Sequence, residues 1–265
     1  LIVTGGTSAK NSGALKDCVT ALGKAGVEFE VFSEIEPNPK TSTCLKAGNA
    51  ARAFCADFVI GIGGGSPMDA SKAVAVYAAN PEMGEEDIYE RQIPSKALPV
   101  ILIGTTAGTG SEVTGVSVLT KSNGKKKSIS GSDCYACVSF CDYSYTMSCP
   151  YNVTLSTGLD AFAHAFESRV ANSSNELSCL YAEKAIFLLK EFILSKKGEL
   201  DTGEEMREKL YTASVFAGLA INITGTCFPH TVGYYLTENY GVPHGVACAA
   251  FMPELIERAK KYCPE

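Results

Sequence analysis

The stretch FVIGIGGGSPMD, residues 58–69, joins an apolar run to three consecutive glycines and then to a proline suited to the first position of a helix. Ser66 is expected to cap that helix, and Asp69 to lie in its first turn, where negative charge is favourable. Glycine lets the backbone approach a ligand closely, and a helix start offers unpaired N–H groups to phosphate. The spacing is not GxGxxG. The stretch therefore predicts a strand, a turn and a helix, with phosphate binding favoured over a plain tight turn.

Similar units surround this stretch throughout the first 148 residues. The predicted strands are Leu1–Thr4, Val27–Phe32, Phe58–Ile62 and Val100–Gly104, and the predicted helices lie near 12–25, 41–55 and 67–80. Such alternation is typical of a parallel sheet covered by helices on both faces. Residues 116–130 differ, because Asn123-Gly124 in their middle predicts the turn of a β-hairpin.

Two more segments of small and hydroxyl residues follow predicted strands. One is Thr4-Gly5-Gly6-Thr7-Ser8, and the other runs from Thr105 to Glu112 with the sequence TTAGTGSE. In an open α/β fold the loops after parallel strands gather at one edge of the sheet, where ligands bind. Three such loops together favour a dinucleotide as the ligand.

From about Tyr151 the apolar residues recur with helical spacing. Three such segments are AEKAIFLLKEFIL (182–194), EEMREKLYTASVFAGLAI (204–221) and ACAAFMPELIERAKKY (247–262). The change falls near Ser148-Cys149-Pro150. The sequence therefore predicts an α/β domain over 1–148 and an all-helical domain over 149–265. Because the chain opens on a strand-like run and stops straight after a helix, we expect it to be truncated at both ends.

The composition excludes several classes of partner. A net charge of −6 over 265 residues argues against nucleic acid, and the basic run at 125–127 is too short to bind a polyanion. No apolar run reaches the roughly 18 residues of a membrane span. Eleven cysteines without a signal peptide predict free thiols in the cytoplasm. The one close pair, Cys134-x-x-Cys137, leaves a zinc or redox role open as a minor alternative.

The histidines and one aspartate form a candidate ligand set. In TGLDAFAHAFES, residues 157–168, Asp160 and His164 lie one helical turn apart, and His230 and His244 lie in PHTVGYYLTENYGVPHG. Three imidazoles and one carboxylate suit a divalent first-row metal, and such a centre can polarise a substrate oxygen. An ordinary Asp–His hydrogen bond is the structural alternative for the first pair, and the spacing alone leaves both open.

Four segments give the chain a specific resemblance. GIGGGSPMDASKA, TTAGTGSEVT, TGLDAFAHAFES and HTVGYYLTENYGVPHG occur here in the order found in the iron-dependent (group III) alcohol dehydrogenases. The resemblance extends over essentially the whole chain. It implies an N-terminal dinucleotide-binding domain and an all-helical C-terminal domain, with the active site in the cleft.

The resemblance also assigns residues. Asp160, His164, His230 and His244 fall on the metal-ligand positions, with Fe(II) the expected ion and Zn(II) an equally suitable one. The positions expected near the cofactor, from the resemblance and the glycine turns together, are Gly5, Gly6, Ser8, Gly64, Gly65, Ser66, Asp69, Thr105, Thr106, Thr109, Thr114 and Lys127.

One side chain departs from the family's pattern, and another position bears on the choice of cofactor. A further histidine is common four residues after the third ligand, and here that position is Tyr234, whose hydroxyl would be a weaker proton relay at neutral pH. Some NAD-preferring members carry an aspartate directly after the first strand, where its charge repels a 2′-phosphate. Here the position is Gly5, and Gly6, Ser8 and Lys10 follow, so we expect NADP rather than NAD.

The function implied is that of a metal-dependent, NAD(P)-linked alcohol dehydrogenase or aldehyde reductase. It would transfer a hydride between a small alcohol, diol or aldehyde and the nicotinamide, and we expect a homodimer. Two alternatives stay open: a catalytically silent nucleotide- and metal-binding remnant of the family, and a zinc enzyme like glycerol dehydrogenase. The sequence does not select a substrate.

Overall fold

A computed structural model of the protein describes residues 1–90, 96–195 and 203–262. The chain divides into two compact units, one formed by Leu1–Thr105 with Ser111–Ser148 and one by Thr106–Gly110 with Cys149–Glu265. The short segment Thr106–Gly110 thus lies in the first half of the sequence but packs with the second unit. The third of the predicted ligand loops is therefore shared between the two units.

The first unit is built on a parallel sheet, as predicted. Its strands are β1 (Ile2–Thr4), β2 (Val31–Phe32), β3 (Val59–Gly63), β4 (Val100–Gly104) and β7 (Val138–Phe140). They lie in the order β2-β1-β3-β4-β7, and every neighbouring pair is parallel. The turns after β1 and β3 therefore lie at one edge of the sheet.

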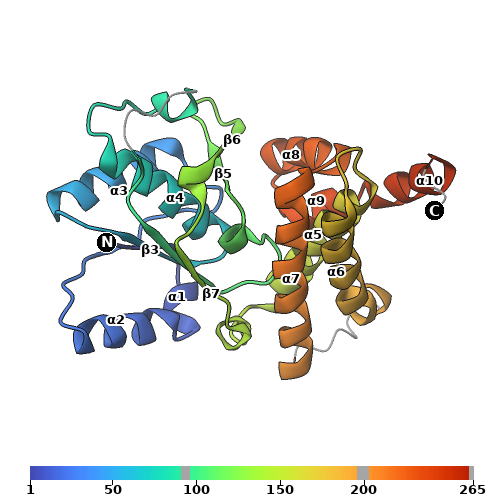
Figure 1. The fold of residues 1–265 in the computed structure, drawn as a ribbon, viewed down its shortest axis with the longest axis horizontal. Helices are drawn as coiled ribbons and strands as arrows, with labels where there is room; N and C mark the ends of the chain where they lie inside the picture. Colours follow the sequence, from blue (N-terminus) through green and yellow to red (C-terminus); the bar gives the residue numbers. More distant parts are fainter. Residues whose placement is uncertain (91–95, 196–202, 263–265) are drawn as a thin grey trace. The chain divides into compact units, whose positions relative to one another are not determined.

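Helices cover both faces of this sheet, as Figure 1 shows. On one face lie α1 (Ser8–Asn11) and α2 (Ala14–Lys24), and on the other α3 (Thr41–Ala53) and α4 (Gly65–Ala79). Successive strand residues point to opposite faces, so Ile60 and Ile62 pack with the first pair of helices while Val59 packs with the second. Both faces of strands β3 and β4 are covered, so each strand is a continuous hydrophobic run in the sequence.

Two details of this unit differ from the prediction. The strand predicted over Val27–Phe32 is shorter, because Gly26 adopts a positive φ of 68° and the Val27 N–H bonds to the carbonyl of Leu22, ending α2. Strand β7 was not predicted. It has three residues, and Val138 and Phe140 are exposed, so it carries no buried apolar pattern.

The predicted β-hairpin is confirmed. Strands β5 (Val116–Thr120) and β6 (Lys126–Ser130) pair antiparallel, and Gly124 in the turn has a φ of 79°. Short 3-10 helices lie at η1 (Asp87–Tyr89), η2 (Ser111–Val113), η3 (Ser132–Cys134) and η4 (Tyr143–Thr146). The hairpin packs against α4 and buries Leu119 and Ile129 in the same core.

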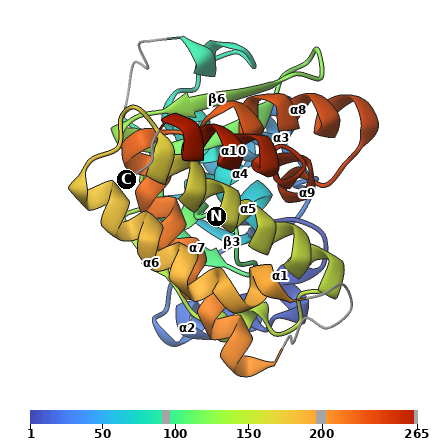
Figure 2. The same ribbon diagram turned by 90° about the vertical axis from the view of Figure 1, so that its right-hand side faces the viewer.

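The second unit is helical. Its helices are α5 (Tyr151–Val170), α6 (Glu176–Leu194), α7 (Glu204–Thr224), α8 (Phe228–Tyr240), α9 (His244–Ala249) and α10 (Met252–Tyr262). Helix α5 packs against α6, α7 and α9 (Figure 2). The single helix predicted over 247–262 is wrong, because the chain breaks at Ala250-Phe251 and Pro253 takes a place in the first turn of α10.

Among the described residues, no single helix is long and apolar enough to cross a membrane. Helices α7 and α8 reach that length and apolarity only when counted together, and they are bent by 109° at their junction. In α7 the buried side chains, Leu210 and Ala217 among them, belong to the packing of this unit.

The cysteines of the described ranges are free thiols. In the Cys134-x-x-Cys137 pair, Cys134 is buried and Cys137 is exposed. Burial raises the pKa of the Cys134 thiol to about 11, the opposite of what a reactive redox cysteine needs. Neither belongs to a group of three or more metal-ligating side chains in the part of the chain that the structure describes.

Candidate metal centre and nucleotide-binding turn

Helix α5 carries three buried ionisable side chains along one stripe. Asp160, His164 and Glu167 follow one another at spacings of four and three residues, so they lie on the same face of the helix. Their exposed fractions are 4%, 6% and 0%. Burying such groups is costly unless partners satisfy them, so this stripe marks a site rather than a solvated face.

The three histidines converge on one oxygen of Asp160. Their Nε2 atoms lie 3.9 Å (His164), 3.5 Å (His230) and 3.8 Å (His244) from Asp160 Oδ1. A transition metal with bonds of about 2.1 Å would place its donor atoms roughly 3.0–3.5 Å apart, so these separations are close to those of a ligand shell. The structure thus brings together the four side chains that the sequence suggested, from α5, α8 and the start of α9.

Two atoms at the centre fit a cation. Asp160 Oδ1 and His230 Nε2 are both buried, and neither makes a hydrogen bond of normal geometry. Buried polar atoms are nearly always satisfied, so a pair left 3.5 Å apart calls for a ligand between them. A carboxylate oxygen and an imidazole nitrogen are both first-row metal donors, so the residues present fit a divalent metal ion.

The outer nitrogens of two histidines are held by acceptors. His230 Nδ1 donates to the Glu167 carboxylate over 2.6 Å, and His164 Nδ1 donates to the carbonyl of Gly108 over 3.2 Å. Donation from Nδ1 leaves the lone pair on Nε2, which is the atom facing Asp160. Glu167 was missed in the sequence, although its position seven residues after Asp160 on an apolar helix is a signal of the same kind.

The charges of the centre favour a cation. Burial opposes ionisation of Asp160, but the histidines around it outweigh burial and hold the pKa of its carboxyl below the ordinary value. Burial lowers the pKa of His164, whereas at His230 the nearby side chains of Asp160, Cys248 and Glu167 outweigh burial and raise the pKa. The carboxylate charges therefore dominate the interior of the site.

Two glycines let neighbouring backbone reach α5. A Cβ atom at Gly245 would overlap the carbonyl oxygen of Ser156, and one at Gly108 would overlap that of Thr157. Gly245 therefore allows α9 to lie against α5 with His244 beside Asp160. Gly108 likewise allows the segment Thr106–Gly110 to lie against α5. The carbonyl of Gly108 then accepts the hydrogen bond that orients His164.

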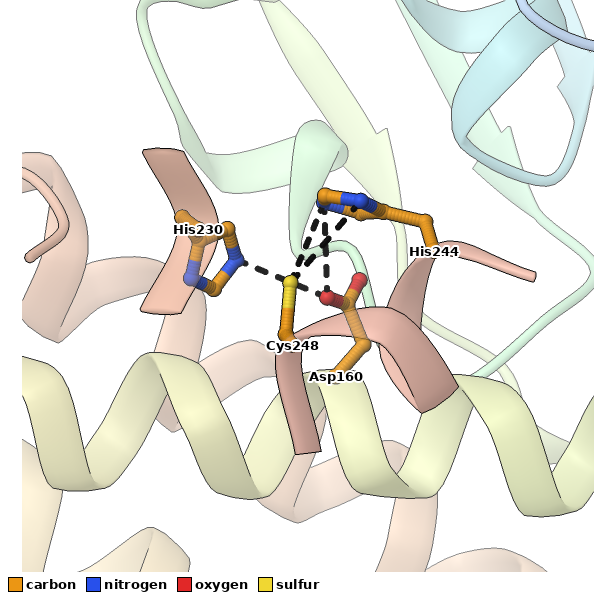
Figure 3. Close-up of side chains that lie close together, drawn as sticks. All are labelled: Asp160, His230, His244 and Cys248. Atoms are coloured by element: carbon orange, nitrogen blue, oxygen red, sulfur yellow. Dashed lines mark hydrogen bonds and ion pairs between the residues drawn. The ribbon is translucent and has the colours of Figure 1, made fainter. Parts of the chain in front are cut away.

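Two further side chains lie at the centre. Cys248, one turn after His244 on α9, brings its sulfur into a group with Asp160, His230 and His244 whose ligand atoms all lie within 4.8 Å of one another (Figure 3). The ring of Tyr234 stacks on that of His244, with centroids 5.1 Å apart and planes 9° apart. Cys248 was not predicted, although His244-x-x-x-Cys248 repeats the spacing of Asp160 and His164.

The glycine turn of the first unit differs from the prediction at its helix start. Helix α4 begins at Gly65, so Pro67 is its third residue and Asp69 lies beyond the first turn. Ser66 is not the cap, because Gly64 holds that position, and the Ser66 hydroxyl accepts a hydrogen bond from the Asn38 N–H over 3.1 Å. The backbone N–H groups of Gly65 and Ser66 have no acceptor within the helix, as at any helix start, and are oriented for an anion.

Asp69 faces the protein interior. Its carboxylate accepts hydrogen bonds from the Ser111 hydroxyl (2.5 Å) and the Val118 N–H (2.9 Å). Lys72, one turn later and fully buried, donates to the carbonyls of Ser111 (2.7 Å), Thr114 (3.0 Å) and Val116 (2.6 Å). These two side chains fasten α4 to the segment that leads into the hairpin. Asp69 and Thr114 thus have partners inside the first unit.

The remaining residues expected near the cofactor divide into two groups. In the first unit, a Cβ at Gly5 would overlap the carbonyl oxygen of Ile35, Gly6 is exposed with a φ of 53°, and Ser8 opens α1. Lys127 holds its ammonium 4.8 Å above the ring of Tyr89, and Thr105 donates its N–H to the Gly63 carbonyl. Thr106 and Thr109 belong to the second unit.

Comparisons with known proteins show which family the chain resembles. The sequence model of "Iron-containing alcohol dehydrogenase" matches residues 1–143, and that of "Fe-containing alcohol dehydrogenase family, C-terminal" matches 154–265. The chain is 34% identical over 243 residues to the sulfoacetaldehyde reductase of Bilophila wadsworthia, covering 90% of this chain and 62% of that protein. It is 32% identical over 260 residues to the bifunctional aldehyde-alcohol dehydrogenase of Escherichia coli (strain K12), covering 93% of this chain and 29% of that protein.

A solved structure gives the same result for the fold. The crystal structure of an iron-containing alcohol dehydrogenase from Thermotoga maritima superposes with a TM-score of 0.89 at 38% identity, over 99% of this chain and 72% of that one. The chain spans less than two thirds of the length of both curated relatives, the sulfoacetaldehyde reductase and the aldehyde-alcohol dehydrogenase.

Proposed function

Because the chain belongs to the iron-containing alcohol dehydrogenase family, we propose that it acts as a metal-dependent, NAD(P)-linked oxidoreductase on small alcohols, diols or aldehydes. One observation carries the proposal: three histidine Nε2 atoms lie within 3.9 Å of Asp160 Oδ1 in a buried site. A hydrogen-bonded Asp–His pair would not need two more imidazoles around the same oxygen.

The residues of the site are proposed to have separate roles in binding and orienting the metal ligands. Asp160, His164, His230 and His244 hold the ion, and Glu167 fixes the orientation of His230. A divalent ion bound there would polarise the oxygen of an alcohol or carbonyl group, and the nicotinamide would carry the hydride. Iron(II) is the proposed ion, with zinc(II) as the alternative that the same donors accept.

Tyr234 is proposed to pass the proton that accompanies hydride transfer. Its ring lies flat against His244, which places the side chain beside the metal-ligating group while leaving the hydroxyl at the far end of the ring. A phenol titrates near pH 10, so the relay is expected to work better as the pH rises towards that value.

For the cofactor we propose NADP in preference to NAD. No acidic side chain follows β1, whose next residues are Gly5, Gly6, Thr7 and Ser8, and Lys10 lies exposed on α1. A 2′-phosphate there would meet hydroxyl, amide and ammonium donors and no carboxylate.

A charge placed in this turn tests the cofactor proposal. Gly5 is unsuitable, because any side chain there overlaps Ile35, so the test uses the exposed Thr7, which caps α1. Thr7→Asp should raise the Kd for NADPH about tenfold and that for NADH much less, since the new charge repels only the 2′-phosphate. Thr7→Asn is the matched control of the same size. An equal rise for both cofactors in Thr7→Asp contradicts the NADP preference.

The whole protein is proposed to be a cytoplasmic homodimer. Free thiols throughout the described ranges support a reducing compartment. Light scattering of the purified protein measures the mass of the assembly directly, and a monomer would contradict the dimer.

Turnover tests the proposed function as a whole. Protein stripped of metal and reloaded anaerobically with Fe(II) or Zn(II) should reduce short aldehydes with NADPH, and the stripped protein should not. Binding of NADPH and metal without turnover of any short aldehyde, alcohol or diol would favour the catalytically silent alternative.

A further inference from the structure

Cys248 lies at the candidate metal centre as well as in the apolar packing of the helical unit. Its side chain is fully buried on α9, and its sulfur belongs to the tight group with Asp160, His230 and His244 (Figure 3). His164 is not part of that group, although its Nε2 lies 3.9 Å from Asp160. Cys248 is therefore closer to the other donors as a set than one of the side chains expected to bind the metal.

The sulfur makes a poor hydrogen bond to its neighbour. Cys248 Sγ lies 3.8 Å from Nδ1 and also 3.8 Å from Nε2 of His244. A sulfur at equal distances from both ring nitrogens is not aligned with the lone pair of either one. The two side chains instead border a common space, the one that Asp160 Oδ1 and His230 Nε2 enter without hydrogen-bond partners of their own.

We propose that Cys248 is a further ligand of the metal centre, its thiolate binding the ion together with Asp160, His164, His230 and His244. The inference rests on the proposed function, because it requires a metal ion at this site. Two helices then contribute ligand pairs with the same four-residue spacing: Asp160 and His164 on α5, and His244 and Cys248 on α9.

A thiolate changes the charge and the selectivity of the site. On binding, a divalent ion displaces the thiol proton to solvent, and the sulfur keeps the electron pair that forms the bond. Asp160 and Cys248 would then be the two negatively charged groups in direct contact with the ion, while the third, Glu167, lies behind the ring of His230. Sulfur is a soft ligand, so it favours zinc(II) and cobalt(II) over the harder manganese(II).

Cobalt(II) is the probe, because a thiolate bound to it absorbs in the near ultraviolet while nitrogen and oxygen ligands do not. The full chain, stripped of metal and titrated with cobalt(II), should develop this charge-transfer band at one ion per chain. Cys248→Ser and Cys248→Ala should lose the band while still binding cobalt. Cys227→Ser is the matched control, since Cys227 lies close by, with its sulfur 3.5 Å from the Glu167 carbonyl, but outside the ligand group, and it should keep the band.

Affinity gives a second readout. Loss of the thiolate should weaken zinc(II) and cobalt(II) by at least about tenfold and manganese(II) by less than about threefold. A purely structural thiol would change all three equally or not at all.

The outcomes separate the two proposals. Stoichiometric cobalt binding by the unaltered protein without the thiolate band overturns the role of Cys248 and leaves the proposed function intact. A band that persists in Cys248→Ala also overturns it. No cobalt uptake by the unaltered protein overturns both. If the Cys248 variants do not fold, the presence or absence of the thiolate band in the cobalt-loaded unaltered protein still tests the proposal.

Discussion

The candidate metal centre of the helical unit and the glycine turn of the sheet unit would present different groups to their ligands. At the candidate metal centre, side chains would supply the ligand atoms, and two of those atoms lie buried without hydrogen-bond partners. At the glycine turn, Asp69 and Lys72 are engaged inside the unit, and backbone N–H groups at the start of α4 are what a phosphate would meet.

The difference has a consequence for substitutions. In the helical unit, a changed side chain should alter metal affinity while the fold is retained, because the helices pack through other residues. In the sheet unit, a changed polar side chain near the turn should alter stability first, because Asp69 and Lys72 hold elements together.

The largest effect is expected at Lys72. Lys72→Met removes the ammonium from three backbone carbonyls and leaves Asp69 without its neighbouring charge 3.7 Å away. Breaking a buried pair by removing one partner costs about 3–5 kcal/mol of unfolding free energy. Urea denaturation measures the loss, and the metal content of the folded protein should stay the same.

Lys46→Met is the matched control, because Lys46 is exposed and pairs with exposed Glu34 on the same unit. Its cost should be less than about 1 kcal/mol. A Lys72→Met protein as stable as the control would show that the contacts of Lys72 with Asp69 and the three carbonyls do not stabilise the sheet unit.

The next effect is expected at Glu167. In Glu167→Gln the amide can donate to His230 Nδ1, which would move the ring hydrogen to Nε2 and remove the lone pair that faces Asp160. Metal affinity should fall about 10–100-fold with little change in stability. Competition with a chelator of known affinity measures the change. Glu183→Gln, exposed on α6, is the control, and equal affinities for the two variants would remove Glu167 from the site.

The smallest effect is expected at Tyr234. Tyr234→Phe keeps the ring stacked on His244 but removes the hydroxyl, so kcat should fall about tenfold, below the range for a direct acid or base. Metal affinity should not change. Tyr235→Phe, exposed on the same helix, provides the comparison in steady-state assays. If both variants keep full kcat, the proton takes another route.

Local patterns explain why much of the fold could be predicted. The strands β1, β3 and β4 are apolar and bounded by glycine, and the hairpin carries its turn sequence. The edge strand β7 could not be predicted, since it has only three residues. Pro253, by contrast, suits the first turn of a helix and could have indicated that α10 starts anew after α9. Residues 106–110 could not be assigned to the helical unit, because contacts distant in sequence decide that placement.

The candidate site shows the same limit. Asp160, His164, His230 and His244 could be proposed from helical spacing together with a family resemblance. Glu167 and Cys248 have spacings just as regular, but a glutamate or cysteine in an apolar helix has many ordinary roles, and only burial beside Asp160 separates them. The partners of Asp69 could not be predicted either, because its carboxylate accepts hydrogen bonds from Ser111 and Val118, which lie more than forty residues later in the chain.

Metal content tests the central claim most directly. Anaerobically purified protein should contain about one iron or zinc ion per chain by elemental analysis. Asp160→Asn, which keeps the volume of the side chain but removes its charge, should contain almost none, while Glu183→Gln should match the unaltered protein. Equal metal in Asp160→Asn and the unaltered protein would contradict a metal centre built around Asp160.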